Sequence, residues 1–296
     1  MELALDWTHY ILASAVFLAL YDLAKKASVR ENAVLPTLLV STLFGCAAFT
    51  AGIALSGGFQ AAVAAPGRVV ALAAGKSAIV AVSWIFTFCA LRTLPISIAT
   101  PIRASAPAIV FVAALFLYGE VPSMLQGLGM LLVFGGYFAF SWAGRHEGID
   151  FLRSKAVWCA FGGTVFSAAS SLWDKYVFQL AEAPVEHVQF WFQVFLVALY
   201  AAILAVCRLS GPKPGRTRFE WRWTMPCVGV LLAAADWLYF RGLAFPEAPI
   251  SVGSLLRRVS VVLTFVLGAR VFHETNLARK ALAMAVILAG VALLCT

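Results

Sequence analysis

The chain has 296 residues, of which 62% are hydrophobic and 12% are charged, and its net charge at pH 7 is +8. A soluble domain carries about a quarter charged residues, so this composition excludes a soluble globular protein and indicates a polytopic membrane protein. In that class a positive net charge reflects basic cytoplasmic loops, and we expect no nucleic-acid partner.

The beginning of the chain, MELALDWTHY, has neither a basic segment nor a small-residue cleavage site before the apolar run, so no cleavable signal peptide is expected. Six cysteines occur singly within apolar segments, without the spacing of a metal site or a disulfide framework. We therefore predict no metal and no cofactor, and interpret the cysteines as small core residues. They are Cys46, Cys89, Cys159, Cys207, Cys227 and Cys295.

Apolar segments of about 20 residues, the length that crosses the roughly 30 Å hydrocarbon layer, occur ten times. The longest polar connections between them are 56–68, 143–155 and 208–222. The fold class predicted is therefore an all-α polytopic membrane protein with ten transmembrane helices and no soluble domain. The predicted spans are 9–28, 34–55, 69–91, 96–117, 122–142, 156–178, 188–207, 224–245, 250–271 and 277–295.

The fourth and ninth spans begin with related sequences. PISIATPIRASAPAIVFVAALFLYGE, residues 95–120, aligns with PISVGSLLRRVSVVLTFVLGARVFHE, residues 249–274, and seven of the 26 positions are identical at a constant offset of 154. With the same offset, GMLLVFGG at 129–136 is similar to AMAVILAG at 283–290. The spans therefore form two related sets of five.

This repeat predicts two units of five helices each, residues 1–146 and 147–296. Because five is an odd number, the second unit enters the membrane from the opposite face, which gives an inverted repeat. Substrate sites in such folds lie near the membrane midplane, between the two units.

Lysine and arginine are distributed unequally between the two sides of the membrane. The connections after the first, third, fifth, seventh and ninth spans hold fourteen of them, and the opposite side holds three: Arg68, Lys175 and Arg241. The positive-inside rule places both termini outside, in a multi-pass protein of the cell (inner or plasma) membrane. The fourteen are Lys25, Lys26, Arg30, Arg92, Arg145, Arg153, Lys155, Arg208, Lys213, Arg216, Arg218, Arg222, Arg279 and Lys280.

Five charged residues are expected deep in the hydrocarbon: Lys76, Arg103, Asp236, Arg257 and Arg258. A charge at that depth is costly and is a functional-site hypothesis by default. Arg103 and Arg257 lie at equivalent positions, each about 12 Å from its own membrane face at 1.5 Å per residue, so their depths differ by about 6 Å. We expect them to flank one ligand. Four cations against one acid favour a ligand with a carboxylate, phosphate or sulfonate group.

A structural role is the alternative for each of these residues. Arg103 and Arg257 would then be locked in pairs with backbone carbonyls or with aspartates of neighbouring helices. Arg258 is as suited to pairing with Asp236 as to contacting a ligand. For Lys76, ligand contact and a structural role are equally compatible with the sequence.

Near the start of each unit, LYD at 20–22 pairs with LWD at 172–174, so Asp22 and Asp174 are related, each after an aromatic residue and near a lysine. An intramembrane carboxylate is a candidate for proton coupling. A lysine close by favours a static ion pair instead. Both interpretations stay open at this point.

Three aromatic residues, Trp84, Trp237 and Tyr239, lie on the spans that carry Lys76 and Asp236. Deep aromatic side chains either wall a cavity and stack on a flat or cationic ligand, or pack in the core. We include all three among the predicted substrate-binding residues, and we predict no catalytic residue.

Ten helices in two sets of five, the sequence ALRTLPIS at 90–97 with its counterpart AFPEAPIS at 244–251, and the GE pair at 119–120 resemble the drug/metabolite transporter superfamily, EamA type. The resemblance covers essentially the whole chain. It implies a basket-shaped transporter that works by alternating access, with a central cavity lined by the third, fourth, eighth and ninth spans. It also implies export of amino acids, metabolites or drugs, and it fixes no coupling ion.

The sequence thus predicts a secondary transporter that exports a small anionic or zwitterionic metabolite, as a monomer or weak homodimer surrounded by membrane lipid. The alternative is a flippase or carrier for lipid-linked or phosphorylated head groups, with Arg103 and Arg257 binding phosphate in a groove open to the lipid. No enzyme is expected, because the sequence has no H-E-x-x-H, G-x-S-x-G or P-loop pattern. A channel would need a continuous polar lining, which single deep charges do not supply.

Overall fold

The structure, a computed structural model, describes residues 6–104, 106, 109–110, 113, 123–145, 152–209, 217–245, 257, 259–272 and 277–294. Within these residues every regular element is a helix. Each of the ten predicted spans overlaps one helix, and two of these, α5 and α12, are described over only nine and 13 residues. The bounds are α1 (Trp7–Val29), α2 (Val34–Leu55), α4 (Gly67–Thr93), α5 (Ile96–Ala104), α7 (Met124–Arg145), α8 (Lys155–Lys175), α9 (Val185–Leu209), α10 (Thr224–Leu243), α12 (Val259–Val271) and α13 (Leu277–Leu294).

Six of these helices are long and apolar enough to cross a membrane within the described part of the chain: α1, α2, α4, α9, α10 and the helix over Lys155–Phe178. The segments Gly127–Gly136 and Val259–Val271 are shorter apolar helices. The prediction of an all-helical polytopic membrane protein is confirmed. The sequence also gives reasons for individual helix starts, because the Asp6 carboxylate accepts the Trp7 N–H and the Ser154 hydroxyl accepts the Val157 N–H.

Two short elements were not expected. A five-residue helix, α3 (Phe59–Val63), lies in the polar connection after α2. A π-helical segment, η1 (Tyr176–Leu180), continues α8 directly. π-Helical segments interrupt the regular hydrogen-bond ladder of an α-helix and occur frequently at functional sites.

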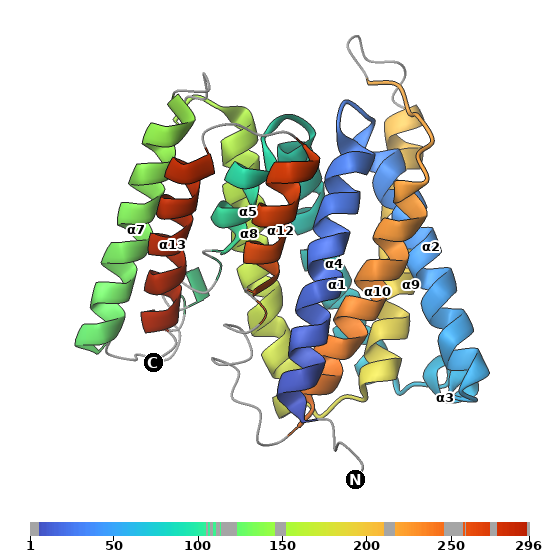
Figure 1. Cartoon of the computed structure of the whole chain (residues 1–296). Coiled ribbons are helices and arrows are strands. Elements are labelled where there is room, and N and C mark those ends of the chain that lie inside the picture. The colour runs from blue at the N-terminus through green and yellow to red at the C-terminus, as the bar shows by residue number, and fades with distance from the viewer. Residues whose placement is uncertain are drawn as a thin grey trace.

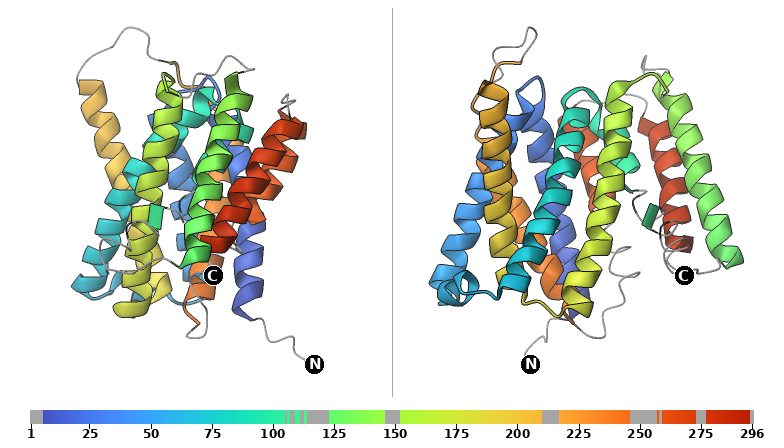
Figure 2. Two further views of the ribbon diagram at one scale, coloured as in Figure 1. Left: turned by 90° about the vertical axis from the view of Figure 1, so that its left-hand side faces the viewer. Right: turned by 180° about the vertical axis from the view of Figure 1, so that it is seen from behind.

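The closest packing joins helices from the first half of the chain to helices from the second half: α1 packs on α10, α4 on α8 and α7 on α13. Figure 1 shows α7 and α13 side by side at one edge of the molecule, with α1, α10, α2 and α9 on the other side. Seen from behind, in Figure 2, α4 and α8 are neighbours. The two halves are therefore interleaved and do not form two separate bodies.

Glycines allow several of these helix pairs to approach closely. A Cβ placed on Gly229 of α10 would collide with the backbone of α2 at Ser41 and would lie 2.5 Å from Gly45 N. A Cβ on Gly45 would in turn lie 2.8 Å from Gly229 O. Because backbone atoms cannot move aside as a flexible side chain can, only glycine fits at this crossing of α2 and α10.

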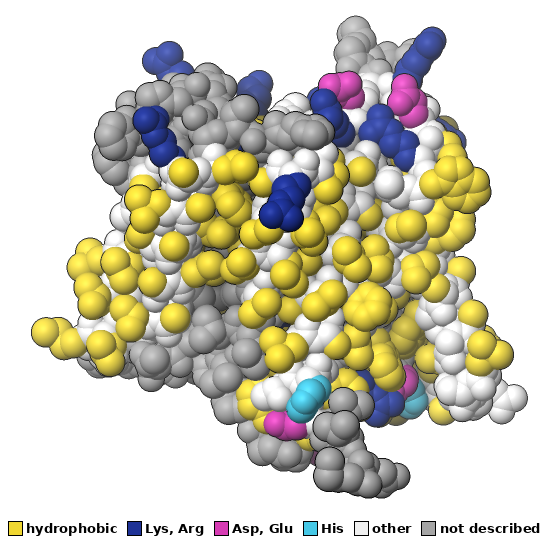
Figure 3. Space-filling model, viewed as in Figure 1, with side chains coloured by type: hydrophobic (Ala, Val, Ile, Leu, Met, Phe, Trp, Pro, Cys, Tyr) yellow, Lys and Arg dark blue, Asp and Glu magenta, His cyan; other side chains and the backbone are white. Residues whose placement is uncertain are grey.

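The outer surface is apolar around the middle of the molecule and basic toward one end. Large hydrophobic side chains such as Leu131, Phe134, Val206 and Leu282 are exposed, as expected for side chains that face lipid tails. In Figure 3 most Lys and Arg side chains on this face gather at the upper end, above a broad band of hydrophobic side chains. The uneven distribution of charge in the sequence is thus present in the fold.

The described connection before α10, residues 217–223, is tied down across the basic end. The Asn32 side chain donates to Glu220 O at 2.8 Å and accepts from Glu220 N at 3.0 Å. The Arg222 guanidinium donates to the carbonyls of Ala27 (2.8 Å) and Arg30 (2.7 Å) at the end of α1. We call residues 217–223 the strap.

Candidate functional site

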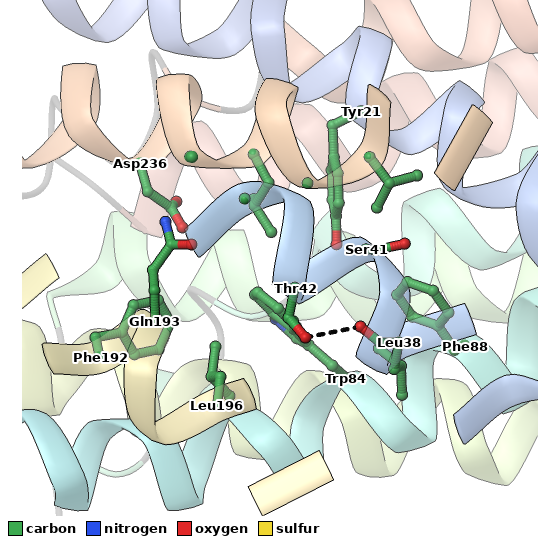
Figure 4. A pocket seen from close by; sticks show the side chains of 15 residues that line it. Tyr21, Leu38, Ser41, Thr42, Trp84, Phe88, Phe192, Gln193, Leu196 and Asp236 are labelled. Atoms are coloured by element: carbon green, nitrogen blue, oxygen red, sulfur yellow. Dashed lines mark hydrogen bonds between the residues drawn. The ribbon is translucent and has the colours of Figure 1, made fainter. Parts of the chain in front are cut away.

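A small cavity lies between five helices, α1, α2, α4, α9 and α10, and is shown from close by in Figure 4. The space open to the centre of a water molecule is about 20 Å³, which holds about one water. The cavity is therefore small. Its lining is Tyr21, Leu38, Ser41, Thr42, Gly45, Trp84, Phe88, Phe192, Gln193, Leu196, Val228, Gly229, Leu232, Ala233 and Asp236.

One face of α10 forms a wall of the cavity, from Val228 to Asp236. Residues three and four positions apart share a helix face, and Gly229, Leu232, Ala233 and Asp236 follow this spacing. The close approach of α2 to α10 at Gly45 and Gly229 brings the polar residues of α2 against this wall. The polar side chains of α2 thus enter the cavity beside a helix crossing that only small residues permit.

Polar groups from three helices meet in the cavity: Ser41 and Thr42 of α2, Gln193 of α9 and Asp236 of α10. The Thr42 hydroxyl is used locally, since it donates to Leu38 O at 2.9 Å, the dashed contact in Figure 4. The Ser41 hydroxyl is buried and has no hydrogen-bond partner among the described residues. In Figure 4 the Gln193 amide and the Asp236 carboxylate point into the same end of the cavity.

Four aromatic rings complete the lining: Tyr21, Trp84, Phe88 and Phe192. Trp84 of α4 and Phe192 of α9 pack edge to face, with their ring centroids 6.3 Å apart. An enclosure of this kind, mostly apolar with a few converging polar groups, is typical of small-molecule binding sites.

The predicted ligand arginine Arg257 is paired with an acid of the cavity wall. Its Nη2 lies 2.8 Å from Asp236 Oδ1, and its guanidinium lies 3.9 Å from the ring centre of Tyr239. The Nε of Arg257 is buried and has no hydrogen-bond partner among the described residues. Arg257 is thus held by Asp236 and Tyr239 while one of its donors stays unused.

The other predicted ligand arginine, Arg103, is directed to a different acid. Its Nη1 lies 2.6 Å from Asp22 Oδ1, and the same oxygen accepts from Lys25 Nζ at 2.6 Å. Neither Arg103 nor Arg257 is part of the described cavity lining, so the expectation that the two flank one void is not met there. Tyr21 lies between the two clusters, within electrostatic reach of both arginines.

Lys76, predicted to bind substrate, is also paired. Its ammonium group donates to Asp174 Oδ1, and its Nζ lies 4.1, 5.0 and 5.7 Å from the ring centres of Phe240, Phe192 and Phe178. Lys76 is 2% exposed and does not line the cavity.

The excess of buried positive charge inferred from the sequence is smaller in the structure. Asp22 and Asp174, which were placed nearer the helix ends, are the partners of the deep cations Arg103 and Lys76. The count of four cations against one acid therefore has to be corrected. The described cluster holds Lys25, Lys76, Arg103 and Arg257 against Asp22, Asp174 and Asp236.

The remaining predicted site residues have different surroundings. Trp84 and Asp236 line the cavity. Trp237 packs instead beside Phe190 and Ala233, with the Arg241 guanidinium 5.4 Å from its ring centre. Arg258 lies outside the described residues.

The cavity is lined by a different set of helices from the one that the resemblance implies. Of the third, fourth, eighth and ninth spans, only the third (α4) and the eighth (α10) contribute described lining residues, and α1, α2 and α9 supply the rest. Sequence reasoning missed Ser41 and Gln193. The available signal was their polarity at the centres of otherwise apolar spans, where polar groups mark helix contacts or sites.

Comparison with known proteins supports the fold of the whole chain and relates part of it to a family. Residues 7–142 match the EamA-like transporter family. A solved structure described only as a crystal structure of a protein aligns with 97% of this chain and 95% of its own, with a TM-score of 0.66 and 19% identity. That likeness concerns the fold alone. No curated protein matches the chain.

Proposed function

From the match of residues 7–142 to the EamA-like transporter family, we propose that the protein is a secondary transporter of a small zwitterionic metabolite. It would work by alternating access in the cytoplasmic membrane and act as an exporter. Transport as such follows from the family, whose members are transporters. The substrate, the direction and the inverted repeat are our proposal.

Reciprocal packing supports an inverted repeat. A Cβ on Gly136 of α7 would meet Ala283 O at 3.2 Å as well as Ile287, and a Cβ on Gly290 of α13 would lie 2.6 Å from Gly129 O and 2.8 Å from Val133. The two sets of contacts are equivalent at the offset of 154: Gly136 corresponds to Gly290, Ala283 to Gly129 and Ile287 to Val133. In Figure 1, α1 runs upward whereas its counterpart α8 runs downward, the direction that opposite insertion requires.

The observation that carries the substrate proposal is the Asp236–Arg257 pair at the cavity wall. The pair joins one acid, which lines the cavity, to one cation behind the lining, so the two charges together are neutral and do not favour a ligand with a net charge. A zwitterion would match the pair: its ammonium group can bind the Asp236 carboxylate in the cavity, and its carboxylate can bind the buried Nε of Arg257 once the cavity opens toward that residue. The rings of Trp84 and Phe192 then cover the apolar part of the ligand.

No observation favours the head-group alternative. The only charged residue of the described lining is an acid, Asp236, and a carboxylate repels a phosphate group. Arg103 and Arg257, proposed to bind phosphate in that alternative, are each bonded to a carboxylate.

A ligand screen tests the proposal. Purified protein is heated with neutral amino acids, dicarboxylates, hexose phosphates or phosphocholine, and the unfolding midpoint is recorded. A ligand that binds the folded state raises this midpoint with its concentration, and we expect the neutral amino acids to do so. A shift with sugar phosphates or phosphocholine alone would contradict the zwitterion proposal.

Variants then locate the site with the ligand that gives a shift. Asp236→Asn and Arg257→Ala should each remove the shift and the uptake of that ligand into proteoliposomes, because each deletes one half of the charge match. Trp158→Ala is the matched control, since Trp158 is exposed on the outer face of α8. If both cavity variants transported as well as this control, the proposed site would be wrong.

A further inference from the structure

The Lys76–Asp174 ion pair is a buried charged group that the proposed substrate site does not use. Lys76 comes from α4 and Asp174 from the end of α8, and the two residues are 2% and 8% exposed. Three phenylalanine rings surround the ammonium group. A buried ion pair is costly to keep desolvated and is weak support for stability by itself, so its presence in this core calls for a functional reason.

The related acid of the first half, Asp22, is held differently. Its Oδ1 accepts from both Lys25 and Arg103, each at 2.6 Å. Two cations fix the charge of one carboxylate. Asp174 has a single cationic partner among the described residues, and that partner is a lysine. Of the two proton-coupling candidates, only Asp174 is thus placed to change its charge.

The other charged groups that face Asp174 come from the substrate site. Asp236 and Arg257 are within its electrostatic reach and are bonded to each other. The charged residue on α5, which also packs on α8, is Arg103, and it is bonded to Asp22. An added positive charge at the pair would thus act on the Asp236–Arg257 pair of the substrate site.

Local structure gives Asp174 a means of responding to such a change. Regular α-helix ends one residue after Asp174, and the π-helical segment η1 follows at once. The Phe178 ring of η1 lies 5.7 Å from the Lys76 ammonium group and packs against Phe240 in a tilted arrangement, with the ring centroids 4.8 Å apart. Insertions of this type are places where a helix changes its hydrogen-bond register.

The pair is also connected to the cavity. The Phe192 ring lies 5.0 Å from Lys76 Nζ on one side and forms part of the cavity lining on the other. Any movement of Lys76 therefore changes the surroundings of a ring that would touch the ligand.

From this geometry we propose that Asp174, paired with Lys76, is the proton-binding site through which the transporter is coupled to the proton gradient. A proton from the aqueous phase adds to the Asp174 carboxylate and forms its O–H bond, while Lys76 stays an ammonium group. The net charge of the pair rises from zero to +1, and Lys76 loses its ionic partner. The coupling of this proton to transport rests on the proposed function, whereas proton binding by Asp174 does not.

Protons themselves are the probe, so no substrate needs to be known. Proteoliposomes are adsorbed to a solid-supported electrode, and a substrate-free step in pH is applied while the transient charge displacement is recorded. The wild type should give a transient that Asp174→Asn reduces at least tenfold, to the level of empty liposomes. Glu186→Gln, which alters the partly exposed pair with Arg241, should keep the wild-type transient.

A second variant guards against misfolding. Asp174→Asn leaves Lys76 buried without its partner, whereas the double variant Lys76→Met/Asp174→Asn removes both charges together and should fold. It should also give no transient. A wild-type transient in the double variant, or a transient lost in Asp22→Asn but kept in Asp174→Asn, would overturn the proposal. Failure of the ligand screen would leave this result untouched, so the two proposals fail separately.

Discussion

Ser41 presents a buried hydroxyl to the cavity, and its Oγ has no hydrogen-bond partner among the described residues. A buried polar group without a partner costs stability, and its removal does not. A hydroxyl kept under these conditions is expected to serve a ligand. This is a sharper indication than Thr42 gives, because the Thr42 hydroxyl is already bonded to its own helix.

We therefore predict that Ser41→Ala leaves the unfolding midpoint unchanged or raises it, while it weakens ligand binding about fivefold, the value of one hydrogen bond of roughly 1 kcal/mol. Thermal unfolding without ligand and a binding titration measure the two effects separately. A variant that lost stability and kept full affinity would show that Ser41 has a structural role.

Individual residues show where sequence reasoning succeeded and where it failed. Trp84 and Asp236 were identified from their depth, and both line the cavity. The ion-pair partners could not be assigned, because Lys76 and Asp174 are 98 positions apart and Arg103 and Asp22 are 81 apart. Contacts over such separations depend on how the helices pack, and a single sequence contains no pattern that specifies them.

At the scale of helices, the crossing of α2 and α10 determines the width of the cavity. Gly45 and Gly229 meet there backbone to backbone. A methyl group at either position would push the two helices apart, and with them Ser41 and Asp236. The same crossing thus affects both stability and binding.

Gly229→Ala should lower the free energy of unfolding by about 1–3 kcal/mol, as overpacking does, or by more, since the obstacle is backbone. Gly52→Ala is the matched control. Gly52 lies within α2, the helix that α10 crosses, and a Cβ there meets nothing within 4 Å. Alanine favours a helix interior over glycine by about 1 kcal/mol, so Gly52→Ala should be neutral or stabilising. Thermal unfolding of both variants in one detergent checks this, and equal losses would contradict the role of the crossing.

The long helices were predictable because an apolar run of fixed length is the strongest signal that a membrane protein sequence contains. The short elements were not. α3 has five residues and lies in a connection, and η1 differs from the α-helix it continues only in hydrogen-bond register. Neither feature leaves a periodic pattern of its own.

For the whole molecule, the main packing interfaces lie between the halves: α1 with α10, α4 with α8, and α7 with α13. The division into residues 1–146 and 147–296 stays a prediction about repeats. It does not describe two independently packed bodies.

We predict that neither half, produced alone, is soluble in mild detergent as a single species. Co-expressed halves should assemble, because the apolar faces of α1 and α4 are complementary to α10 and α8. Purification through a tag on one half, followed by detection of the other, measures this assembly. A stable isolated half would contradict the interleaved packing.

The orientation of the molecule is a further prediction. The strap and the ends of α1 and α4 lie at the basic end, which the positive-inside rule assigns to the cytoplasm. Of the residues counted for this rule, Lys25, Lys26 and Lys280 are in fact buried, and Lys26 donates to the carbonyls of Leu91 and Leu94. Arg30, Arg92 and Arg222 remain at that end. A phosphatase fused after the last residue should be active outside the cell, and a fluorescent protein that matures only in the cytoplasm should stay dark.

The strap bears on how a ligand could enter the protein at its basic end. Four hydrogen bonds from Asn32 and Arg222 hold residues 217–223 against the tip of α1, and each contributes about 0.5–1.5 kcal/mol. Lifting the segment away from α1 would thus cost several kcal/mol, so we expect the strap to stay bound in all but a small minority of molecules. In the predicted orientation this end faces the cytosol, and a ligand that entered here would have to wait for such an opening.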